Sequence, residues 1–204
     1  MPEGLRARKR TAAMLRIQSV ALDLFEARGF DAVTIDEIAA ASDVSPSSVY
    51  RYFGTKEQVV LWDRSEQMLR ALAAEAMADP VPLAGLRRVI MTALSGFSAA
   101  DERQLLRRLR LAGTAPSLEQ ATVAYTYSAA RVLEDVLARQ LHRRVEDLDV
   151  QVFAHALAGG LLGMFHHWQG TGFREPLRDV VERVFEIFFE GLDIVTATSV
   201  PSAH

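Results

Sequence analysis

"TIDEIAAASDVSPSSVYRYFGTKEQVV", residues 34–60, carries the start and stop signals of short helices separated by breaks of a few residues. Thr34 and Glu37 have the spacing of a capping box and predict the start of a first helix. After the turn "SDV", Ser45 can cap a second helix whose first position is Pro46, where a missing N–H costs nothing. Gly54 then ends that helix, and a further helix is predicted to begin just after it.

Helical periodicity continues on both sides of this stretch, and the sequence shows no sustained period-2 alternation of the kind that marks strands. Apart from the two short helices, the predicted spans are residues 11–28, 56–77, 82–97, 101–112, 117–142, 147–169 and 176–195. We therefore expect an all-α protein of about nine helices. The helices are short and individually capped before residue 62 and long and apolar after it, which predicts a small domain at residues 1–61 and a larger one at residues 62–204.

Composition limits the class of protein. The chain has 204 residues, of which 50% are apolar, and this is enough to bury a core. It contains no cysteine, which excludes disulfides and thiolate metal sites. The basic N-terminus is not followed by an apolar run, and the longest apolar stretch, residues 156–165, is about half of the roughly 20 residues that span a bilayer. We expect a soluble, cytoplasmic protein that does not enter a membrane.

The two short helices and their three-residue turn have the spacing of a helix-turn-helix, whose second helix places its exposed face in the major groove of DNA. The predicted outer face suits this role. Ser47, Ser48 and Arg51 carry donors that can reach base edges, and an arginine can pair bidentately with guanine. Pro46 offers an apolar contact to a thymine methyl group.

Other side chains of this stretch are suited to the DNA backbone. Val49 and Phe53 fill the inner face of the second helix, so the hydroxyls of Tyr50 and Tyr52 are expected to be free for phosphates. Lys56 stands in the first turn of a helix, where a cation costs about 0.3–1 kcal/mol, and a phosphate in front of it would explain its presence. The remaining predicted DNA contacts are the caps Thr34 and Ser45 and the basic arm residues Arg8, Lys9 and Arg10.

Residues 34–60 resemble the DNA-binding signature of the TetR family of one-component transcriptional regulators, and the resemblance covers about residues 11–62. The matching positions are Thr34, Ile38, Ala39, Val44, Ser45, Val49, Tyr50, Tyr52, Phe53, Lys56 and Glu57. Asp43 and Ser47 stand where many members have glycine, and Asp43 is expected to adopt a positive φ. The resemblance implies an obligate homodimer, a palindromic operator and repression that a small molecule relieves. The arm looks closest to actinobacterial members, some of which sense acyl-CoA-like ligands.

The last two predicted helices are apolar around most of their circumference, so we expect them to pair with a second copy of the chain. The candidate dimer residues are Phe153, Leu157, Gly159, Gly163, Val184, Phe185 and Phe188. The family resemblance places a cavity for a small, largely apolar ligand among the middle helices. Its candidate lining residues are Trp62, Met68, Met91, Phe97, Tyr125, Tyr127, Arg131, Met164, His167 and Trp168, any of which core packing explains equally well.

Two other classes of protein compete with this interpretation. An enzyme is disfavoured, because His155 and His166 share a helix face without a third metal ligand in register, and no Ser-His-Asp or Gly-rich catalytic arrangement is visible. No cofactor and no metal ion are expected. A helical scaffold that never contacts DNA predicts no basic cluster near residues 46–56, yet Arg51 and Lys56 lie there. The sequence therefore favours a DNA-binding transcriptional regulator.

Overall fold

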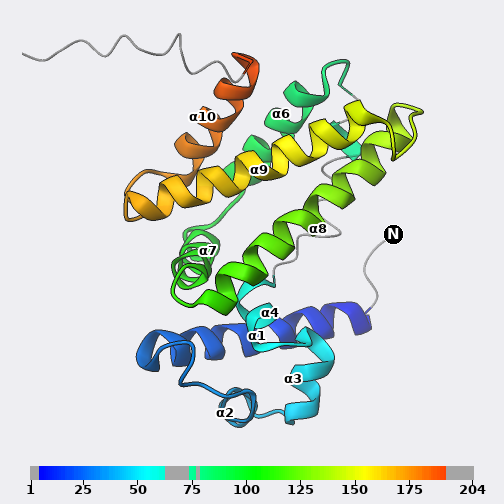
Figure 1. Cartoon of the computed structure of the whole chain (residues 1–204). Helices are drawn as coiled ribbons and strands as arrows, with labels where there is room; N and C mark the ends of the chain where they lie inside the picture. Colours follow the sequence, from blue (N-terminus) through cyan, green and yellow to red (C-terminus); the bar gives the residue numbers. More distant parts are fainter. Residues whose placement is uncertain (1–4, 63–73, 77–78, 192–204) are drawn as a thin grey trace, which may run out of the picture. The chain divides into compact units, whose positions relative to one another are not determined.

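The computed structural model describes residues 5–62, 74–76 and 79–191, and over these residues it consists of α-helices joined by turns, which confirms the predicted all-α class (Figure 1). The helices are α1 (Leu5–Arg28), α2 (Ile35–Ala41), α3 (Pro46–Phe53), α4 (Lys56–Leu61), α6 (Pro82–Ser95), α7 (Ala99–Ala112), α8 (Pro116–Gln140), α9 (Leu148–Gly170) and α10 (Leu177–Phe189). Most begin and end within two residues of the predicted bounds, because caps and glycines mark those ends in the sequence.

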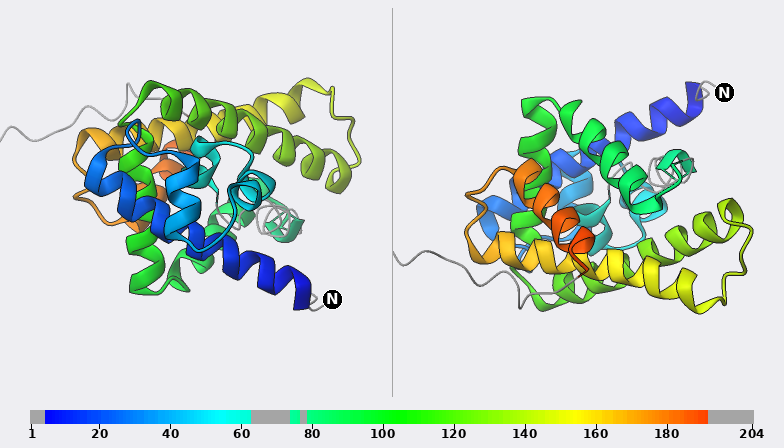
Figure 2. Two further views of the ribbon diagram at one scale, coloured as in Figure 1. Left: turned by 90° about the horizontal axis from the view of Figure 1, so that it is seen from below. Right: turned by 90° about the horizontal axis from the view of Figure 1, so that it is seen from above.

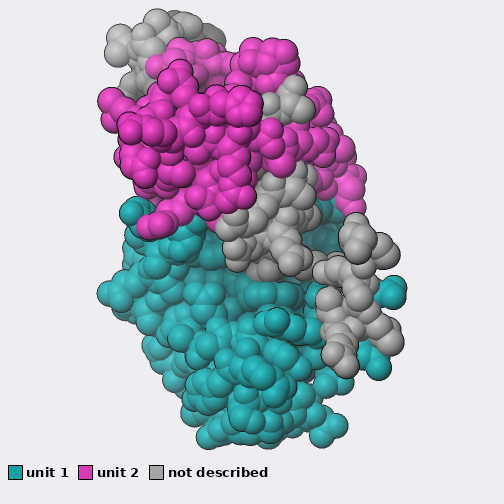
Figure 3. Space-filling model, turned by 90° about the vertical axis from the view of Figure 1, so that its right-hand side faces the viewer, with its two compact units in different colours: residues 1–67, 97–129 teal, residues 68–96, 130–204 magenta. Residues whose placement is uncertain are grey.

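The chain folds into two compact units, which Figure 3 colours separately. Unit 1 comprises residues 1–67 and 97–129, and unit 2 comprises residues 68–96 and 130–204. Helix α8 contributes its first part to unit 1 and its last part to unit 2. Packing therefore does not follow chain order, since α7 belongs with the N-terminal helices. The predicted domains, residues 1–61 and 62–204, were defined by DNA binding on one side and by ligand binding and dimerisation on the other. This functional boundary stays a prediction.

Unit 1 has one apolar core that fixes the helix-turn-helix. Helix α1 contributes a buried stripe at i, i+4 and i+8, namely Ile17, Ala21 and Phe25, as its periodicity predicts. Buried side chains of α2, α3, α4, α7 and α8 complete the cluster: Ile35, Ile38, Ala39, Val49, Phe53, Val59, Val60, Leu111 and Leu118. In Figure 1 α2 and α3 lie on one side of α1, and the views in Figure 2 agree with this arrangement. The two short helices are thus held by burial rather than by their own length.

Helix α4 is shorter than predicted. It ends at Leu61, and Trp62 is extended with φ −60° and ψ 127°, so the prediction of one continuous helix from residue 56 to 77 is wrong at this point. Side chains of other helices bind the carbonyls at its end. Gln18 Nε2 donates to the carbonyl oxygens of Val59, at 2.9 Å, and of Trp62, at 2.6 Å. Arg108 Nη1 also donates to the Trp62 oxygen, at 2.8 Å. These side-chain donors satisfy carbonyl groups at the end of the helix.

In unit 2, α10 packs against both α6 and α9. Gly160 of α9 permits the close approach, because a Cβ at this position would lie 2.7 Å from the Phe188 ring. Arg87 of α6 forms an ion pair with Glu182 of α10. By length and composition alone, helix α9 could cross a membrane, a test that the core helix of a soluble protein also passes, and 28% of its apolar window is buried inside the protomer.

Candidate nucleic-acid interface

The start of α2 has the predicted capping box. The Thr34 hydroxyl accepts from Glu37 N at 3.2 Å, and Glu37 Oε2 accepts from Thr34 N at 2.9 Å. Arg28 at the end of α1 adds an ion pair to Glu37 of 2.8 Å. The hydrogen bond from Thr34 N, followed by the contact with Arg28, lowers the pKa of Glu37 to about 2. The Thr34 hydroxyl is therefore engaged in capping, and its contact with DNA stays a prediction.

The turn between α2 and α3 has the predicted unusual backbone. Asp43 adopts φ 54°, which an aspartate tolerates better than most residues. The chain then returns toward α2 through a hydrogen bond from Val44 N to the carbonyl of Ala39 at 3.0 Å. Ser45 follows as the N-cap of α3 and accepts from Ser48 N at 3.3 Å.

Helix α3 has a buried face and an exposed face. Val49 and Phe53 are 0% and 7% exposed and belong to the core of unit 1. On the opposite side Tyr50 is 56% exposed, although it is a large aromatic side chain. Pro46, Ser47 and Arg51 are exposed as well, and Ser48 is half-buried. The Ser47 and Ser48 hydroxyls each lie 2.9 Å from Ser45 Oγ.

The prediction that Val49 and Phe53 alone fill the inner face of α3 is wrong at Tyr52, while the contact of its hydroxyl with a phosphate stays a prediction. The side chain is half-buried and packs against the unit 1 cluster, because residue 52 follows Val49 by three positions and shares its side of the helix. Two cations lie near its ring. The Arg51 guanidinium carbon is 5.0 Å from the ring centroid, and that of Arg10 is 6.0 Å away. Tyr52 thus supports the arginines by cation–π contact.

Lys56 has partners within its own chain. Its Nζ donates to the carbonyl oxygens of Phe30 at 2.8 Å and Val33 at 3.0 Å. It also lies 4.2 Å from the centroid of the Phe30 ring. Two carbonyl dipoles and an aromatic face offset the cost of a cation in the first turn of α4. Lys56 therefore has partners that explain its place without an external phosphate, and its contact with DNA stays a prediction.

The basic N-terminal residues belong to a helix. Helix α1 begins at Leu5, so Arg8, Lys9 and Arg10 lie in its first turns, and the prediction of an arm separate from the helix is wrong over these residues. The reason is local, because Leu, Arg, Ala and Lys are all strong helix formers. Each of the three side chains is exposed, and their contact with phosphates stays a prediction.

Two arginines of α7 hold the helices that carry this interface. Arg107 Nε donates to Glu26 Oε1 at 2.7 Å, and its Nη2 donates to Asp23 Oδ1 at 2.5 Å, which raises the pKa of Arg107. The neighbouring Arg108 binds the end of α4, as described above. The sequence predicted a helix over residues 101–112 and did not indicate the partners of its arginines.

Two segments of the chain match models of known protein families. Residues 17–61 match the model of the bacterial regulatory proteins of the tetR family, and residues 81–193 match the model of the MftR C-terminal domain. The chain belongs to the TetR family. It is a DNA-binding transcriptional regulator and not an enzyme.

Two mycobacterial relatives of this TetR-family regulator illustrate the match. The protein named for the regulation of mycofactocin biosynthesis, MftR of Mycobacterium tuberculosis, is 26% identical over 198 residues, which is 95% of this chain and 98% of that protein. The repressor Rv3405c of the same species is 41% identical over 110 residues, which is 51% of this chain and 56% of that protein.

Solved structures share the fold of the TetR-family regulator. SmeT, the repressor of a multidrug efflux pump of Stenotrophomonas maltophilia, has a TM-score of 0.58 at 20% identity and covers 93% of this chain and 94% of its own. FadR of Thermus thermophilus, solved in complex with lauroyl-CoA, has a TM-score of 0.54 at 24% identity and covers 94% of this chain and 99% of its own.

The predicted ligand residues of the TetR-family regulator are divided between the two units. Trp62, Phe97, Tyr125 and Tyr127 belong to unit 1, whereas Met91, Arg131, Met164, His167 and Trp168 belong to unit 2. Met68 lies outside the described residues. Trp62 is half-buried and packs against the core of unit 1, with its ring edge-on to Phe53 at a centroid distance of 5.9 Å.

Trp168 and His167 have partners within unit 2. Trp168 is 1% exposed, and its Nε1 donates to the Glu175 carbonyl at 2.9 Å. His167 Nε2 lies 3.1 Å from the Glu175 carboxylate, and the pKa of Glu175 is lowered chiefly by this contact. Both side chains therefore shape the corner between α9 and α10, and their role toward a ligand stays a prediction.

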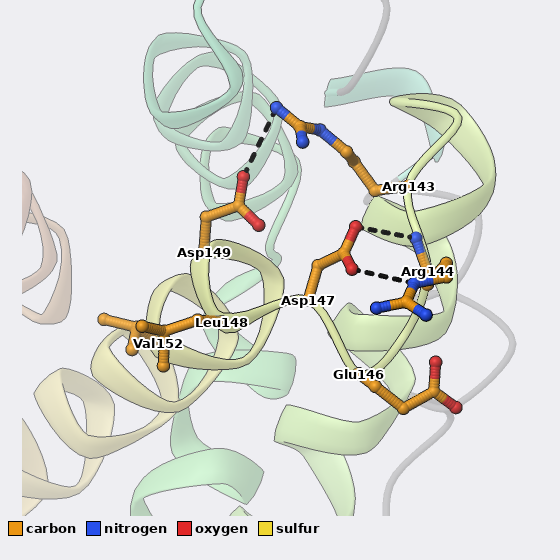
Figure 4. A pocket seen from close by; sticks show the side chains of 7 residues that line it. All are labelled: Arg143, Arg144, Glu146, Asp147, Leu148, Asp149 and Val152. Atoms are coloured by element: carbon orange, nitrogen blue, oxygen red, sulfur yellow. Dashed lines mark hydrogen bonds and ion pairs between the residues drawn. The ribbon is translucent and has the colours of Figure 1, made fainter.

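A hollow of about 650 Å³ lies at the turn between α8 and α9 in unit 2 (Figure 4). Its lining residues are Arg143, Arg144, Glu146, Asp147, Leu148, Asp149 and Val152. Arg144 is 3.0 Å from Asp147, and Arg143 is 3.6 Å from Asp149, so each arginine is paired with an aspartate. None of the predicted ligand residues lines this hollow.

The predicted dimer residues divide into three groups by exposure. Leu157 and Phe185 are 8% and 3% exposed and are buried in the protomer itself, so the prediction that they face a partner is wrong for these two. Gly159 and Gly163 are exposed, and a Cβ at either would meet nothing within 4 Å. Phe153, Val184 and Phe188 are half-buried. Because these helices are apolar around most of their circumference, the sequence did not reveal which side of each helix the protomer covers.

The alternative of a metal site finds no geometric support in the described part of the chain. No group of three or more potential metal ligands occurs there. His155 Nδ1 instead lies 3.2 Å from the buried Glu134 carboxylate.

Proposed function

We propose that α3 is the recognition helix of a ligand-responsive repressor, which binds a palindromic operator as a homodimer. The observation that carries the proposal is the exposed face of α3. Tyr50 is 56% exposed, while Val49 beside it is fully buried. An exposed aromatic next to an exposed arginine has little structural purpose in a protomer and is suited to contact with DNA.

The geometry suggests a role for each exposed side chain. Arg51 is held over Tyr52 and within 3.3 Å of Ser48 Oγ, so its guanidinium is oriented before DNA binds. We assign Arg51 and Ser47 to base edges and Tyr50 to a phosphate. Ser45 and Thr34 act mainly as caps. Arg8, Lys9 and Arg10 are assigned to phosphates, and Pro46 to a thymine methyl group.

The test is binding to the DNA that flanks the protein's own gene, measured by fluorescence anisotropy against unrelated DNA of equal length. Arg51→Ala is expected to weaken binding by about 1–3 kcal/mol and to relax the preference at one base pair of each half-site. Arg139→Ala is the matched control, because it removes an exposed arginine of unit 2 whose ion pair with Asp135 is long, at 3.8 Å. If both variants bind equally well, α3 does not read the operator.

We propose further that the dimer forms through the exposed sides of α9 and α10, with Gly159, Gly163, Phe153, Val184 and Phe188 at or near the contact. Large apolar side chains remain exposed on these helices, among them Val152 at 57% and Phe189 at 48%. Such exposure on a soluble protein marks an interaction surface. Sedimentation at micromolar concentration should give twice the mass of the chain, and a monomer would refute this part.

The effector is proposed to be a small, largely apolar molecule, with acyl-CoA-like compounds as the class to try first. The candidates in unit 2, Met91, Arg131, Met164, His167 and Trp168, combine apolar bodies with a few polar groups, as ligand sites do. A thermal-shift screen of acyl-CoAs of different chain length, with free fatty acids and coenzyme A as controls, tests the class. A compound that raises the Tm must also release the operator, otherwise it is not the inducer. The regulator is proposed to act in the cytoplasm, where the DNA is, and needs no cofactor.

A further inference from the structure

Two arginines that are far apart in the sequence meet at the ring of Tyr52. The guanidinium carbon of Arg51, in α3, lies 5.0 Å from the ring centroid, and that of Arg10, in α1, lies 6.0 Å from it. Both distances are within the range over which the face of an aromatic ring attracts a cation. One ring therefore holds a basic side chain of the recognition helix and a basic side chain of the N-terminal helix.

The ring and Arg51 are both restrained by other contacts. Tyr52 is half-buried and packs against the core of unit 1, which fixes the position of its ring. Arg51 Nη2 lies 3.3 Å from the Ser48 hydroxyl, and this hydroxyl lies 2.9 Å from that of the N-cap Ser45. The guanidinium of Arg51 is thus held by a ring and by a hydroxyl before any DNA is bound.

The charges of these two arginines remain available for DNA. Neither Arg10 nor Arg51 forms an ion pair with another of the described residues, whereas Arg28 and Arg107 of the same unit each bind a carboxylate. An aromatic ring attracts a cation without neutralising it. Both guanidinium groups can therefore still bind a phosphate or the edge of a guanine.

We propose that the ring of Tyr52 determines operator specificity, because it positions Arg51 for one base pair and Arg10 for a phosphate of the same half-site. The inference rests on the proposed function, in which Arg51 contacts a base edge. A bidentate pair with guanine requires one orientation of the guanidinium, so an arginine that is fixed in advance discriminates more sharply between bases. The role belongs to the ring, and the Tyr52 hydroxyl stays available for a phosphate.

The first experiment measures discrimination, which is the ratio of the dissociation constants for an operator changed at one base pair and for the unchanged operator. The base pair to use is the one whose replacement no longer matters in Arg51→Ala. Tyr52→Leu keeps an apolar side chain at the edge of the core and removes the ring, and it is expected to lower discrimination about two- to fivefold. Tyr52→Phe keeps the ring and should keep the discrimination, even where loss of the hydroxyl weakens binding to all sequences alike.

The second experiment determines whether Arg10 acts through the same ring. Arg10→Ala is expected to weaken operator binding about two- to fivefold more per half-site in the wild-type background than in Tyr52→Leu. Arg8→Ala is the matched control, because Arg8 is an exposed arginine of the same helix and no contact with an aromatic ring is found for it among the described residues. Its effect should be the same in both backgrounds.

A third measurement uses the wild-type protein without DNA, so it does not depend on the folding of Tyr52→Leu. A guanidinium over the face of a ring is shielded by the ring current. The Nε–H NMR signals of Arg10 and Arg51 should therefore be shifted upfield from that of Arg8. Each signal is assigned by its loss when the arginine is replaced by lysine.

Three results each overturn the proposal: unchanged discrimination in folded Tyr52→Leu, an effect of Arg10→Ala that does not depend on residue 52, or arginine signals that are not shifted. Failure of the proposed function has a different signature. In that case the wild-type protein prefers no base pair at any position, while upfield-shifted signals of Arg10 and Arg51 still support their contact with the ring.

Discussion

Replacing Gln18 by leucine removes a buried amide that links α1 to the end of α4. Gln18 is 2% exposed, and its Nε2 donates to the carbonyls of Val59 and Trp62 at 2.9 and 2.6 Å. Leucine has a similar volume and cannot donate. The Trp62 oxygen keeps its bond from Arg108, at 2.8 Å, whereas Val59 is fully buried and its carbonyl loses the side-chain donor.

The expected cost follows from these contacts. Two side-chain hydrogen bonds contribute about 0.5–1.5 kcal/mol each, and an unsatisfied buried acceptor costs about 1–3 kcal/mol. The better burial of leucine offsets a part, so we expect Gln18→Leu to lower the free energy of unfolding by about 2–4 kcal/mol. For a chain of this size each kcal/mol lowers the Tm by about 2–4 °C, which gives a decrease of about 4–16 °C.

The assay is thermal unfolding followed by circular dichroism, with all variants at one protein concentration because a dimer's Tm depends on concentration. Gln120→Leu is the matched control, since Gln120 is exposed on α8 in the same unit. A Gln18→Leu Tm within about 1 °C of the Gln120→Leu value would show that the buried amide does not hold α4 to α1.

Two further predictions concern local features. The pKa of Glu37, about 2 in the fold against an ordinary 4.5, means that its ionised form stabilises the protein above pH 4.5 and that this contribution is lost as the pH falls toward 2. In urea unfolding the stability gap between wild type and Glu37→Gln should therefore shrink over this pH range, and a constant gap would contradict the assignment. Gly85→Ala places a Cβ against the Ala76 backbone oxygen and should cost about 1–3 kcal/mol, whereas Gly159→Ala, with free space, should gain up to about 1 kcal/mol in the monomer. Equal Tm values for the two variants, measured under monomeric conditions, would refute the close contact between residue 85 and the Ala76 backbone oxygen.

The sequence predicted those features that depend on neighbours along the chain. The capping pair of Thr34 and Glu37 and the Ser45 cap involve residues three positions apart, and the structure has both. The positive φ of Asp43 is likewise a property of one residue in a tight turn. Such signals are visible in a single chain because they do not depend on how distant helices pack.

The sequence did not predict contacts between residues far apart in the chain. Lys56 binds carbonyls 23 and 26 positions before it, and Gln18 binds carbonyls 41 and 44 positions after it. Every residue has a backbone carbonyl, so the amino-acid sequence does not show which carbonyls accept a hydrogen bond from a distant side chain. The packing of Tyr52 against the core was missed for the same reason, since a ring at the edge of the core can be placed only when the neighbouring helices are known.

The helical form of the N-terminal basic residues changes how their charge can act. Successive residues of an α-helix point about 100° apart, so Arg8, Lys9 and Arg10 fan out over more than half of the helix circumference. Arg10 is also close to the ring of Tyr52. The phosphates along one face of DNA can then contact only some of these three side chains at one time. Fewer counterions should consequently be released on binding than the number of basic residues in this segment suggests.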